Sequence, residues 1–154
     1  MQNPNDIQIG GNHYKGLPVQ HWDLMYWLQA DYHTGCASKY LIRFDAKNGI
    51  EDLKKAMHFI SKLGYLGELS VWRRWYRAFQ LWRYRFELQE FLDATARLSL
   101  LPQSLEHHRR QAVLALLHGD LVNALELTQS LICRYEEHTT HDTGVPGPRY
   151  ANQG

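Results

Sequence analysis

The sequence has little cysteine, no long apolar run and almost no net charge, and each shortage excludes a class of protein. Its two cysteines, Cys36 and Cys133, lie far apart and form no CxxC pair, so we expect two small core residues in a reducing cytoplasm. No apolar run is long enough to cross a bilayer, and the polar start MQNPNDIQIGG lacks the pattern of a signal peptide. We therefore expect a cytoplasmic protein with no membrane partner.

Motifs of the common enzyme classes are also missing. The chain contains no P-loop, GxGxxG or GxSxG, and its nine histidines form no HxxxH or HExxH metal pattern. Its 17 lysines and arginines balance 16 aspartates and glutamates, which leaves a net charge of +1. The total charge therefore does not indicate a polyanionic partner. The distribution is uneven, however, because Val71–Arg85 holds five arginines and no acid.

Helical periodicity is what the sequence does contain, and it predicts an all-α fold. The clearest buried stripe runs at three- and four-residue steps from Leu53 to Leu63. The predicted helices are residues 21–32, 36–46, one that starts after Asn48–Gly49, 68–98, 104–118 and 120–137. We expect a small N-terminal helical module (residues 1–64), a helical extension (65–137) and a disordered tail (138–154). The extension would consist of a long aromatic helix followed by a C-terminal helical hairpin.

Local signals predict where several of these helices begin and end. Asn48 is expected to be an N-cap, with Glu51 three residues later as its capping-box partner. Leu101–Pro102 should end the aromatic helix, because the residue before a proline is disfavoured in a helix. Gly119 fits a helix C-terminus, and Asp120 fits the cap of the last helix.

Three cations recur every fourth residue in the stretch SKYLIRFDAKNG. Lys39, Arg43 and Lys47 would stack along one helix face, where like charges repel by a few tenths of a kcal/mol per pair. They would also lie near the N-terminus of the next helix, which favours anions. This arrangement fits a phosphate group. The alternative is that the chain's own carboxylates neutralise the three cations; these are Asp45, Glu51 and Asp52.

Two further groups could complete a phosphate site. The segment GGNHYKG places His13, Tyr14 and Lys15 together beside flexible glycines, so that two side chains could reach phosphate and Tyr14 could stack on a base. Magnesium in phosphoryl-transfer sites is commonly held by one or two carboxylates. Glu51 and Asp52 are the candidates for Mg²⁺, and Asp52 is preferred because Glu51 is expected to cap a helix.

The segment VWRRWYRAFQLWRYRF combines aromatic residues with arginines. Its aromatic residues fall on one helical face, which we expect to be the core stripe of the long helix; they are Trp72, Trp75, Tyr76, Phe79, Trp82 and Phe86. Such a stripe is typical of packing within the chain or against another subunit. Nucleic-acid binding is the less favoured interpretation and would use Arg73, Arg74, Arg77 and Arg85.

Several short motifs together resemble one known family. The order IQIGGNHYKG, VQHWDL and GCASKYLIRFDAKNGIEDLKKAMHFISKL is similar to a tailed-phage family long catalogued as a domain of unknown function. Its best understood members are described as nucleotide kinases that act on deoxynucleoside monophosphates without a P-loop. The resemblance covers about residues 7–63. Two positions depart from the family pattern: His21 stands where the family usually has proline, and Cys36 where it often has asparagine.

The resemblance implies a phage protein of deoxynucleotide metabolism in the host-cell cytoplasm. It would bind a nucleoside monophosphate and transfer phosphate from a nucleoside triphosphate, with Mg²⁺. A homo-oligomer is expected on a separate ground, because a small module with a ligand at its edge often completes its site from a neighbouring subunit. Arg43 and Asp52 would then be catalytic. Substrate would be bound by His13, Tyr14, Lys15, Lys39, Arg43 and Lys47. The alternative is a catalytically silent phage accessory protein that binds a host or phage protein.

Overall fold

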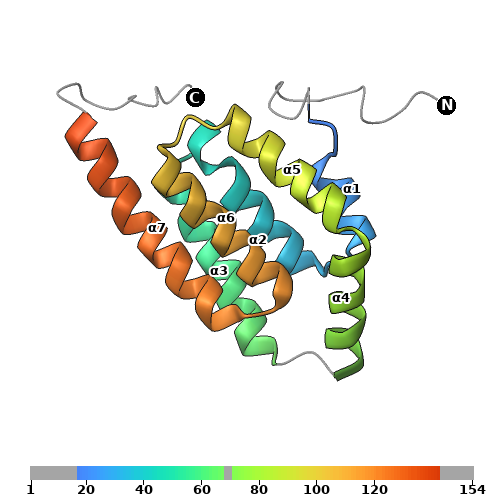
Figure 1. Cartoon of the computed structure of the whole chain (residues 1–154). Helices are drawn as coiled ribbons and strands as arrows, with labels where there is room; N and C mark the ends of the chain where they lie inside the picture. Colours follow the sequence, from blue (N-terminus) through green and yellow to red (C-terminus); the bar gives the residue numbers. More distant parts are fainter. Residues whose placement is uncertain (1–16, 68–70, 143–154) are drawn as a thin grey trace, which may run out of the picture.

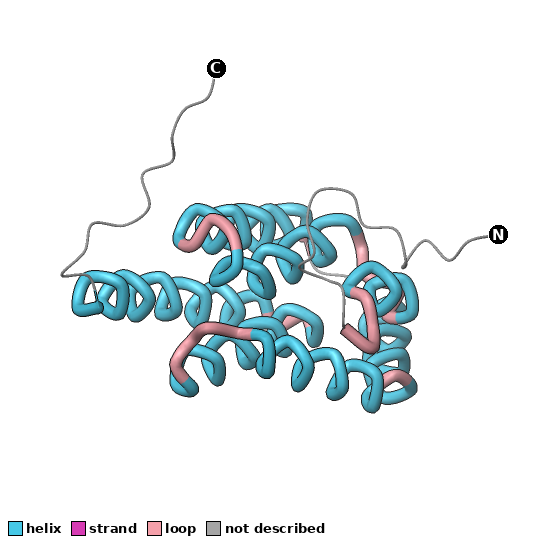
Figure 2. The backbone as a smooth tube through the Cα atoms, turned by 90° about the horizontal axis from the view of Figure 1, so that it is seen from above, coloured by secondary structure: helices cyan, strands magenta, loops and turns pink. Residues whose placement is uncertain are grey.

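Helices make up nearly all of the described chain, which comprises residues 17–67 and 71–142 of a computed structural model (Figure 1, Figure 2). Across these residues there are seven α-helices, one 3₁₀ turn and no strand, so the predicted all-α class is confirmed. The elements are α1 (His21–Trp27), α2 (Tyr32–Arg43), η2 (Phe44–Ala46), α3 (Ile50–Leu66), α4 (Val71–Arg83), α5 (Arg85–Leu98), α6 (Gln103–His118) and α7 (Leu121–Asp142). No helix in the described ranges combines the length and hydropathy needed to cross a membrane.

One hydrophobic core joins the N-terminal and C-terminal halves of the described chain. Helix α2 packs against α3 and α6, and α3 packs against α7 (Figure 1). The core therefore includes Leu41, Leu53 and Ile60 from the first half together with Leu116 and Leu131 from the second, all of them fully buried. These contacts connect the predicted 1–64 module with the predicted 65–137 extension through one common core.

The start of α3 differs from the expected capping box. Gly49, not Asn48, is the N-cap, and no side chain caps it. The Asn48 amide instead donates to Asp52 Oδ1 at 3.1 Å. Gly49 has a φ of +54°, and a Cβ at this position would lie 3.3 Å from Tyr135 Cε1. Glycine is therefore required here both by backbone conformation and by the close approach of Tyr135.

The predicted long aromatic helix is divided at Tyr84 into α4 and α5. Its aromatic stripe is not buried within the chain, so the expected core role is wrong. Trp72 is 85% exposed and Trp82 is 62% exposed. The face of α4 that meets the rest of the protein carries Leu81, Gln80 and Arg77, and Arg77 donates to Asp31 Oδ2 at 2.9 Å. The sequence pattern identified the apolar face correctly but gave no information on which face the protein covers.

The last two helices follow their predicted signals more closely. Gly119 ends α6 in the left-handed conformation, with a φ of +79°, and Asp120 Oδ1 accepts a hydrogen bond from the Asn123 amide at 3.2 Å. Helix α7 continues to Asp142, so the first five residues of the expected tail are helical; residues 143–154 lie outside the described ranges. Cys133 is exposed and Cys36 is only partly buried, which corrects their prediction as core residues.

Candidate functional site

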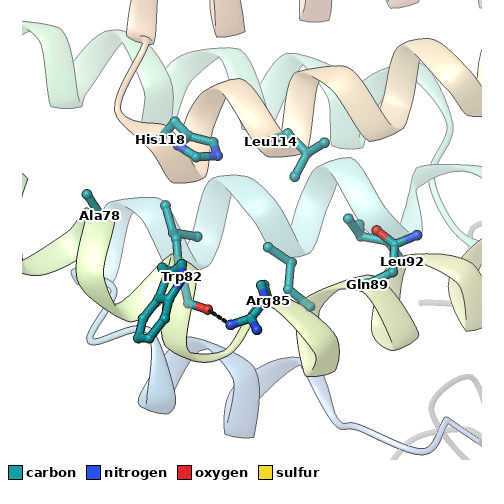
Figure 3. Close-up of a pocket in the computed structure, with 9 residues that line it drawn as sticks. Ala78, Trp82, Arg85, Gln89, Leu92, Leu114 and His118 are labelled. Atoms are coloured by element: carbon teal, nitrogen blue, oxygen red, sulfur yellow. Dashed lines mark hydrogen bonds between the residues drawn. The ribbon is translucent and has the colours of Figure 1, made fainter.

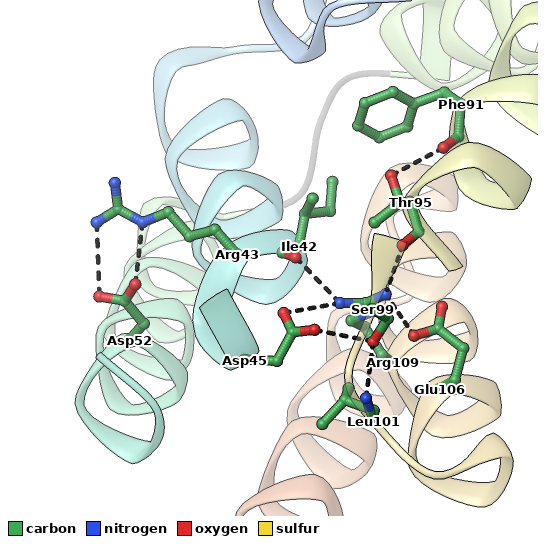
Figure 4. A network of polar contacts seen from close by, with 10 residues as sticks. All are labelled: Ile42, Arg43, Asp45, Asp52, Phe91, Thr95, Ser99, Leu101, Glu106 and Arg109. Atoms are coloured by element: carbon green, nitrogen blue, oxygen red, sulfur yellow. Dashed lines mark hydrogen bonds and ion pairs between the residues drawn. The ribbon is translucent and has the colours of Figure 1, made fainter. Parts of the chain in front are cut away.

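The predicted phosphate site lies where α2 ends and α3 begins. Arg43 is the last residue of α2, and Asp52 lies in the first turn of α3. Arg43 Nε donates to Asp52 Oδ2 at 2.9 Å, and Arg43 Nη2 donates to Asp52 Oδ1 at 3.5 Å (Figure 4). The structure therefore brings together the two residues that the sequence analysis named as catalytic.

The two partners of this ion pair differ in their exposure to solvent. The Asp52 side chain is fully buried, whereas 17% of the Arg43 side chain remains exposed. Asp52 also accepts the hydrogen bond from Asn48, so both of its carboxylate oxygens are engaged. A buried carboxylate that is held from two sides fixes the orientation of the guanidinium at the surface.

Aromatic rings hold the same arginine from another direction. The Arg43 guanidinium carbon lies 4.8 Å from the centroid of the Tyr40 ring, and Lys55 Nζ lies 5.9 Å from that centroid. Tyr40 in turn stacks on Phe59 of α3, with the two ring centroids 5.8 Å apart. Cations are attracted to ring faces at such distances. Tyr40 and Lys55 thus extend the candidate site, and neither residue was among the predicted site residues.

We call this surface the α2–α3 face and define it by Lys39, Tyr40, Arg43, Asn48, Asp52 and Lys55. Lys39 is exposed and precedes Arg43 by one helical turn, so both cations share one side of α2. Lys47 does not continue the row, because α2 ends at Arg43 and a 3₁₀ turn follows; the backbone of Lys47 has φ −133° and ψ −98°. The expected ladder of three cations on one helix is therefore reduced to two.

The acids near the ladder have separate partners. Lys55 Nζ lies 2.6 Å from Glu51 Oε1 and 4.0 Å from Asp52 Oδ1. The hydrogen bond with Glu51 raises the pKa of Lys55 above its ordinary value. Asp45, which the sequence analysis also considered as a partner of the ladder, turns inward to Arg109 of α6. Among the acids of the sequence ladder, Asp52 pairs with Arg43, Glu51 with Lys55 and Asp45 with Arg109.

Arg109 forms an enclosed polar network beside the α2–α3 face (Figure 4). Its Nη1 donates to Asp45 Oδ1 at 3.0 Å and to the Ile42 carbonyl at 3.1 Å, and its Nη2 donates to the Thr95 carbonyl at 3.4 Å. Glu106 completes the shell as a second ion-pair partner. Only 2% of the Arg109 side chain is exposed, so this arginine links α2, α5 and α6 and is closed to a ligand.

His21, at the first of the two departures from the family pattern, is the first residue of α1. This position suits proline as well, because the first helical residue needs no backbone N–H donor within the helix. The imidazole Nε2 lies 2.9 Å from Ser38 Oγ, and the ring packs against Phe91. Burial, with a smaller contribution from the charge of Lys39, lowers the pKa of His21 from 6.5 to about 4.

Cys36, the second departure, lies on α2 between Tyr32 and Tyr40, one turn from each. A hydrogen bond with Cys36 raises the pKa of the Tyr32 hydroxyl. The thiol therefore contacts the aromatic end of the same helix face that carries Arg43.

The described residues do not fit a dedicated metal centre. Both Asp52 oxygens accept hydrogen bonds from Arg43 and Asn48, and Glu51 is occupied by Lys55. Within residues 17–67 and 71–142, no group of three or more His, Cys, Asp or Glu side chains is placed to hold a metal ion. Asp52, the preferred Mg²⁺ ligand of the sequence analysis, accepts hydrogen bonds from Arg43 and Asn48; Mg²⁺ held by Asp52 or Glu51 together with substrate phosphates stays a prediction.

The arm that would supply His13, Tyr14 and Lys15 lies outside the described residues. The chain that follows it is described from Leu17 onward. Leu17 packs against the core, and His21 contacts Ser38, which neighbours Lys39 on α2.

Two hollows lie away from the α2–α3 face. One, of about 340 Å³, opens between α4, α5 and α6 and is bordered by Trp82, Arg85 and His118 over a leucine-rich floor (Figure 3). The other, of about 970 Å³, contains Arg73, Arg74 and Arg77 together with His33 and His118.

The larger hollow includes Asp31, which caps α2 by accepting from the Thr34 amide at 2.9 Å. Burial alone raises the pKa of Asp31, but hydrogen bonds from Thr34 and Arg77 outweigh it and lower the pKa. Since Asp31 and Arg43 lie at opposite ends of α2, the hollow is about 18 Å from the ion pair at a rise of about 1.5 Å per residue. That separation is too long for direct phosphoryl transfer between ligands bound at the two places.

Comparison of the chain with protein-family models, with curated proteins and with solved structures found no match.

Proposed function

We propose that the α2–α3 face binds the phosphate of a nucleoside monophosphate, in a phage protein of deoxynucleotide metabolism. The observation that carries this proposal is the arrangement of Arg43, whose guanidinium is oriented by buried Asp52 and by the Tyr40 ring yet stays partly exposed. A guanidinium held in advance loses little conformational freedom when it binds an anion. The family resemblance supports the same assignment.

Neighbouring cations favour a dianionic ligand at this place. Lys39 is exposed one turn before Arg43, and 41% of the Lys55 side chain is exposed. Like charges on one face repel one another in the free protein, and a bound phosphate would relieve that repulsion. The arm is also within reach: Lys15 precedes His21 by six residues, and six residues span at most about 20 Å. We assign base stacking to Tyr14, and closure over the phosphate to His13 and Lys15.

For the second half of the proposed reaction, phosphate would pass from a nucleoside triphosphate to the bound monophosphate. Arg43 and Lys39 would offset the negative charge on the transferred group, which is the main requirement in phosphoryl transfer. Mg²⁺ would enter with the triphosphate as part of the substrate, since Asp52 already positions Arg43. Lys47, which is exposed beyond the end of α2, is assigned to the triphosphate.

The test is thermal unfolding of the full chain with each deoxynucleoside mono- and triphosphate, with and without Mg²⁺. A ligand at a hundred times its Kd stabilises by about 2.7 kcal/mol, which raises the Tm by several degrees. We expect at least one monophosphate to do this, and Arg43→Ala to abolish the shift. Arg110→Ala is the matched control, because Arg110 pairs with Asp93 at a distance of 2.7 Å on another surface. If no nucleotide raises the Tm, the proposal fails.

A catalytically silent accessory protein is the second candidate, and one observation favours it. The described carboxylates near Arg43 are all paired and form no metal site. In that case nucleotide binding would persist without turnover, and the chain would act by binding a host or phage protein. Incubation with labelled triphosphate and each monophosphate distinguishes the two candidates: labelled diphosphate supports the kinase, and binding without product supports the silent protein.

A further inference from the structure

Helix α4 turns its aromatic side outward. We call this side the aromatic face and define it by six residues: Trp72 (85% exposed), Trp75 (72%), Tyr76 (52%), Phe79 (50%), Trp82 (62%) and Phe86 (70%), the last from the start of α5. On its opposite side α4 meets the protein through Leu81 and through the Arg77–Asp31 ion pair. In the part of the chain that the structure describes, no element covers the aromatic face.

The exposed area matches what a stable protein interface needs. An aromatic side chain has about 200 Å² of surface, so six rings at these exposures leave roughly 800 Å² uncovered. The largest apolar patch on a typical monomer is about 300–600 Å². A standard interface buries about 800 Å² on each partner. The aromatic face thus has the size of one half of such an interface.

The spacing of the face identifies a helix as the covering partner. Trp72, Trp75, Phe79, Trp82 and Phe86 follow one another at steps of three, four, three and four residues. This is the alternation of the a and d positions of a heptad, which pack against another helix, and Tyr76 widens the seam at one e position.

We propose that the aromatic face is covered by α4 of a second copy of this chain, in an antiparallel pair. The proposal is independent of the nucleotide function. In antiparallel pairs an a residue of one helix faces a d residue of the other. A twofold axis at the middle of α4, beside Arg77, places Trp72 against the partner's Trp82 and Trp75 against the partner's Phe79. All four seam residues of α4 are then matched, in an interface that is the same on both copies.

Charge favours the antiparallel arrangement over the parallel one. Helix α4 carries four arginines and no acid. Two arginines flank the C-terminal end of the seam: Arg83, and Arg85 of α5, whose guanidinium carbon lies 5.2 Å from the Trp82 ring centroid and 4.3 Å from that of Phe86. In a parallel pair Arg83 would face the partner's Arg83. In the antiparallel pair the two lie twelve helical positions apart, or about 18 Å along the axis. Arg77 does not oppose pairing, because it lies on the side of α4 turned to Asp31.

The oligomeric state of the full chain is the first test. Light scattering or sedimentation at micromolar concentration should give a dimer or a larger symmetric assembly. Phe79→Glu should shift it to a monomer, with the dimer dissociation constant raised at least a hundredfold. Tyr65→Glu is the matched control, because Tyr65 is 82% exposed on α3, outside the aromatic face, and the assembly should persist. A monomeric wild type, or a dimer that survives Phe79→Glu, overturns the proposal.

Disulfide trapping tests the pairing itself, in a Cys36→Ser, Cys133→Ser background. Mixing Trp72→Cys with Trp82→Cys should give a crosslinked dimer under mild oxidation. Trp72→Cys alone should not, because the two copies of residue 72 lie about 15 Å apart in the antiparallel pair. Crosslinking of Trp72→Cys to itself overturns the antiparallel arrangement. A monomer that binds anionic vesicles or single-stranded DNA through these tryptophans instead assigns the face to lipid or to nucleic acid and also overturns the proposal.

Discussion

Two arginine–aspartate pairs each have one member near the end of α2, Arg43 in one and Asp45 in the other, and they have opposite surroundings (Figure 4). In the inner pair, Arg109 is 2% exposed and Asp45 is 7% exposed. In the outer pair, Asp52 is fully buried but Arg43 is 17% exposed. The inner arginine is surrounded by protein acceptors, including two backbone carbonyls. The outer arginine pairs with a buried acid on one side and is partly exposed to solvent on the other.

This difference in solvent exposure shows which residue of an ion pair can bind a ligand. When both partners are enclosed, the pair connects helices, and its removal exposes an uncompensated charge inside the protein. When the acid alone is enclosed, its role is to orient the arginine at the surface. The members of the outer pair are 9 residues apart in the sequence and those of the inner pair 64, and burial separates the structural arginine from the candidate ligand-binding arginine.

The largest expected effect comes from removing the inner arginine. Arg109→Met leaves Asp45 and Glu106 without their partner inside the protein, and such losses cost about 3–5 kcal/mol. Urea denaturation should show this loss in the free energy of unfolding. Arg110→Met, at the neighbouring position but in a surface pair with Asp93, should change it by less than about 1 kcal/mol. Equal effects of the two substitutions would mean that the enclosed network does not stabilise the fold.

The next largest expected loss of stability occurs at acidic pH and is due to His21, which lies beside Lys39. The folded-state pKa of about 4 lies below the ordinary value of 6.5, so protons bind more readily to the unfolded chain. The free energy of unfolding should fall by about 3 kcal/mol as the pH falls from 6.5 to 4. His21→Gln keeps a hydrogen-bonding group near Ser38 and does not titrate. Its unfolding free energy should depend much less on pH in that window; identical pH profiles would contradict a His21 imidazole that is neutral in the folded protein.

Breaking the outer pair should cost less than breaking the inner one. Arg43→Ala leaves Asp52 with the Asn48 hydrogen bond and with Lys55 nearby, and water can enter where the arginine was partly exposed. We expect a loss of about 1–2 kcal/mol, the cost of a buried polar group that loses one partner. A double-mutant cycle with Asp52→Asn should give a coupling energy smaller than that of Arg109 and Asp45. The reverse order would remove the distinction between the two pairs.

Local signals in the sequence predicted the helices, but not the partners of charged side chains. The α3 stripe and the Gly119–Asp120 turn were predicted correctly, because each depends on residues within one or two turns. Asp45 was considered as a partner of Lys39, Arg43 and Lys47, yet it pairs with Arg109, 64 residues away. Such a pairing depends on how α6 packs across α2, which periodicity does not encode.

The expected burial of the aromatic face within the chain was wrong for a related reason, whereas its packing against another subunit stays a prediction. Helical spacing identified an apolar side of α4, and the usual preference for burial assigned it to the core. The opposite side of α4 contacts the protein through Leu81 and the Arg77–Asp31 ion pair, a contact distant in sequence. A local signal can be ambiguous as well. The Asn48 side chain could cap a helix or donate a hydrogen bond to Asp52, and in the structure it donates to Asp52.

The smallest expected effect on stability is that of Lys39→Ala. This substitution tests whether the exposed part of the α2–α3 face binds a ligand. Lys39 is exposed, so Lys39→Ala should change the unfolding free energy by less than about 0.5 kcal/mol. It should nevertheless weaken monophosphate binding about tenfold, as expected when one charge-assisted hydrogen bond worth about 1.5 kcal/mol is lost. Lys54→Ala, at another exposed position on α3 outside the face, should leave both quantities unchanged.

Titration calorimetry with the monophosphate that raises the Tm measures the affinity. Unchanged affinity of Lys39→Ala would restrict the ligand contact to Arg43 and leave Lys39 as a solvated cation. The same variant should raise the pKa of His21, because the charge of Lys39 contributes to lowering it.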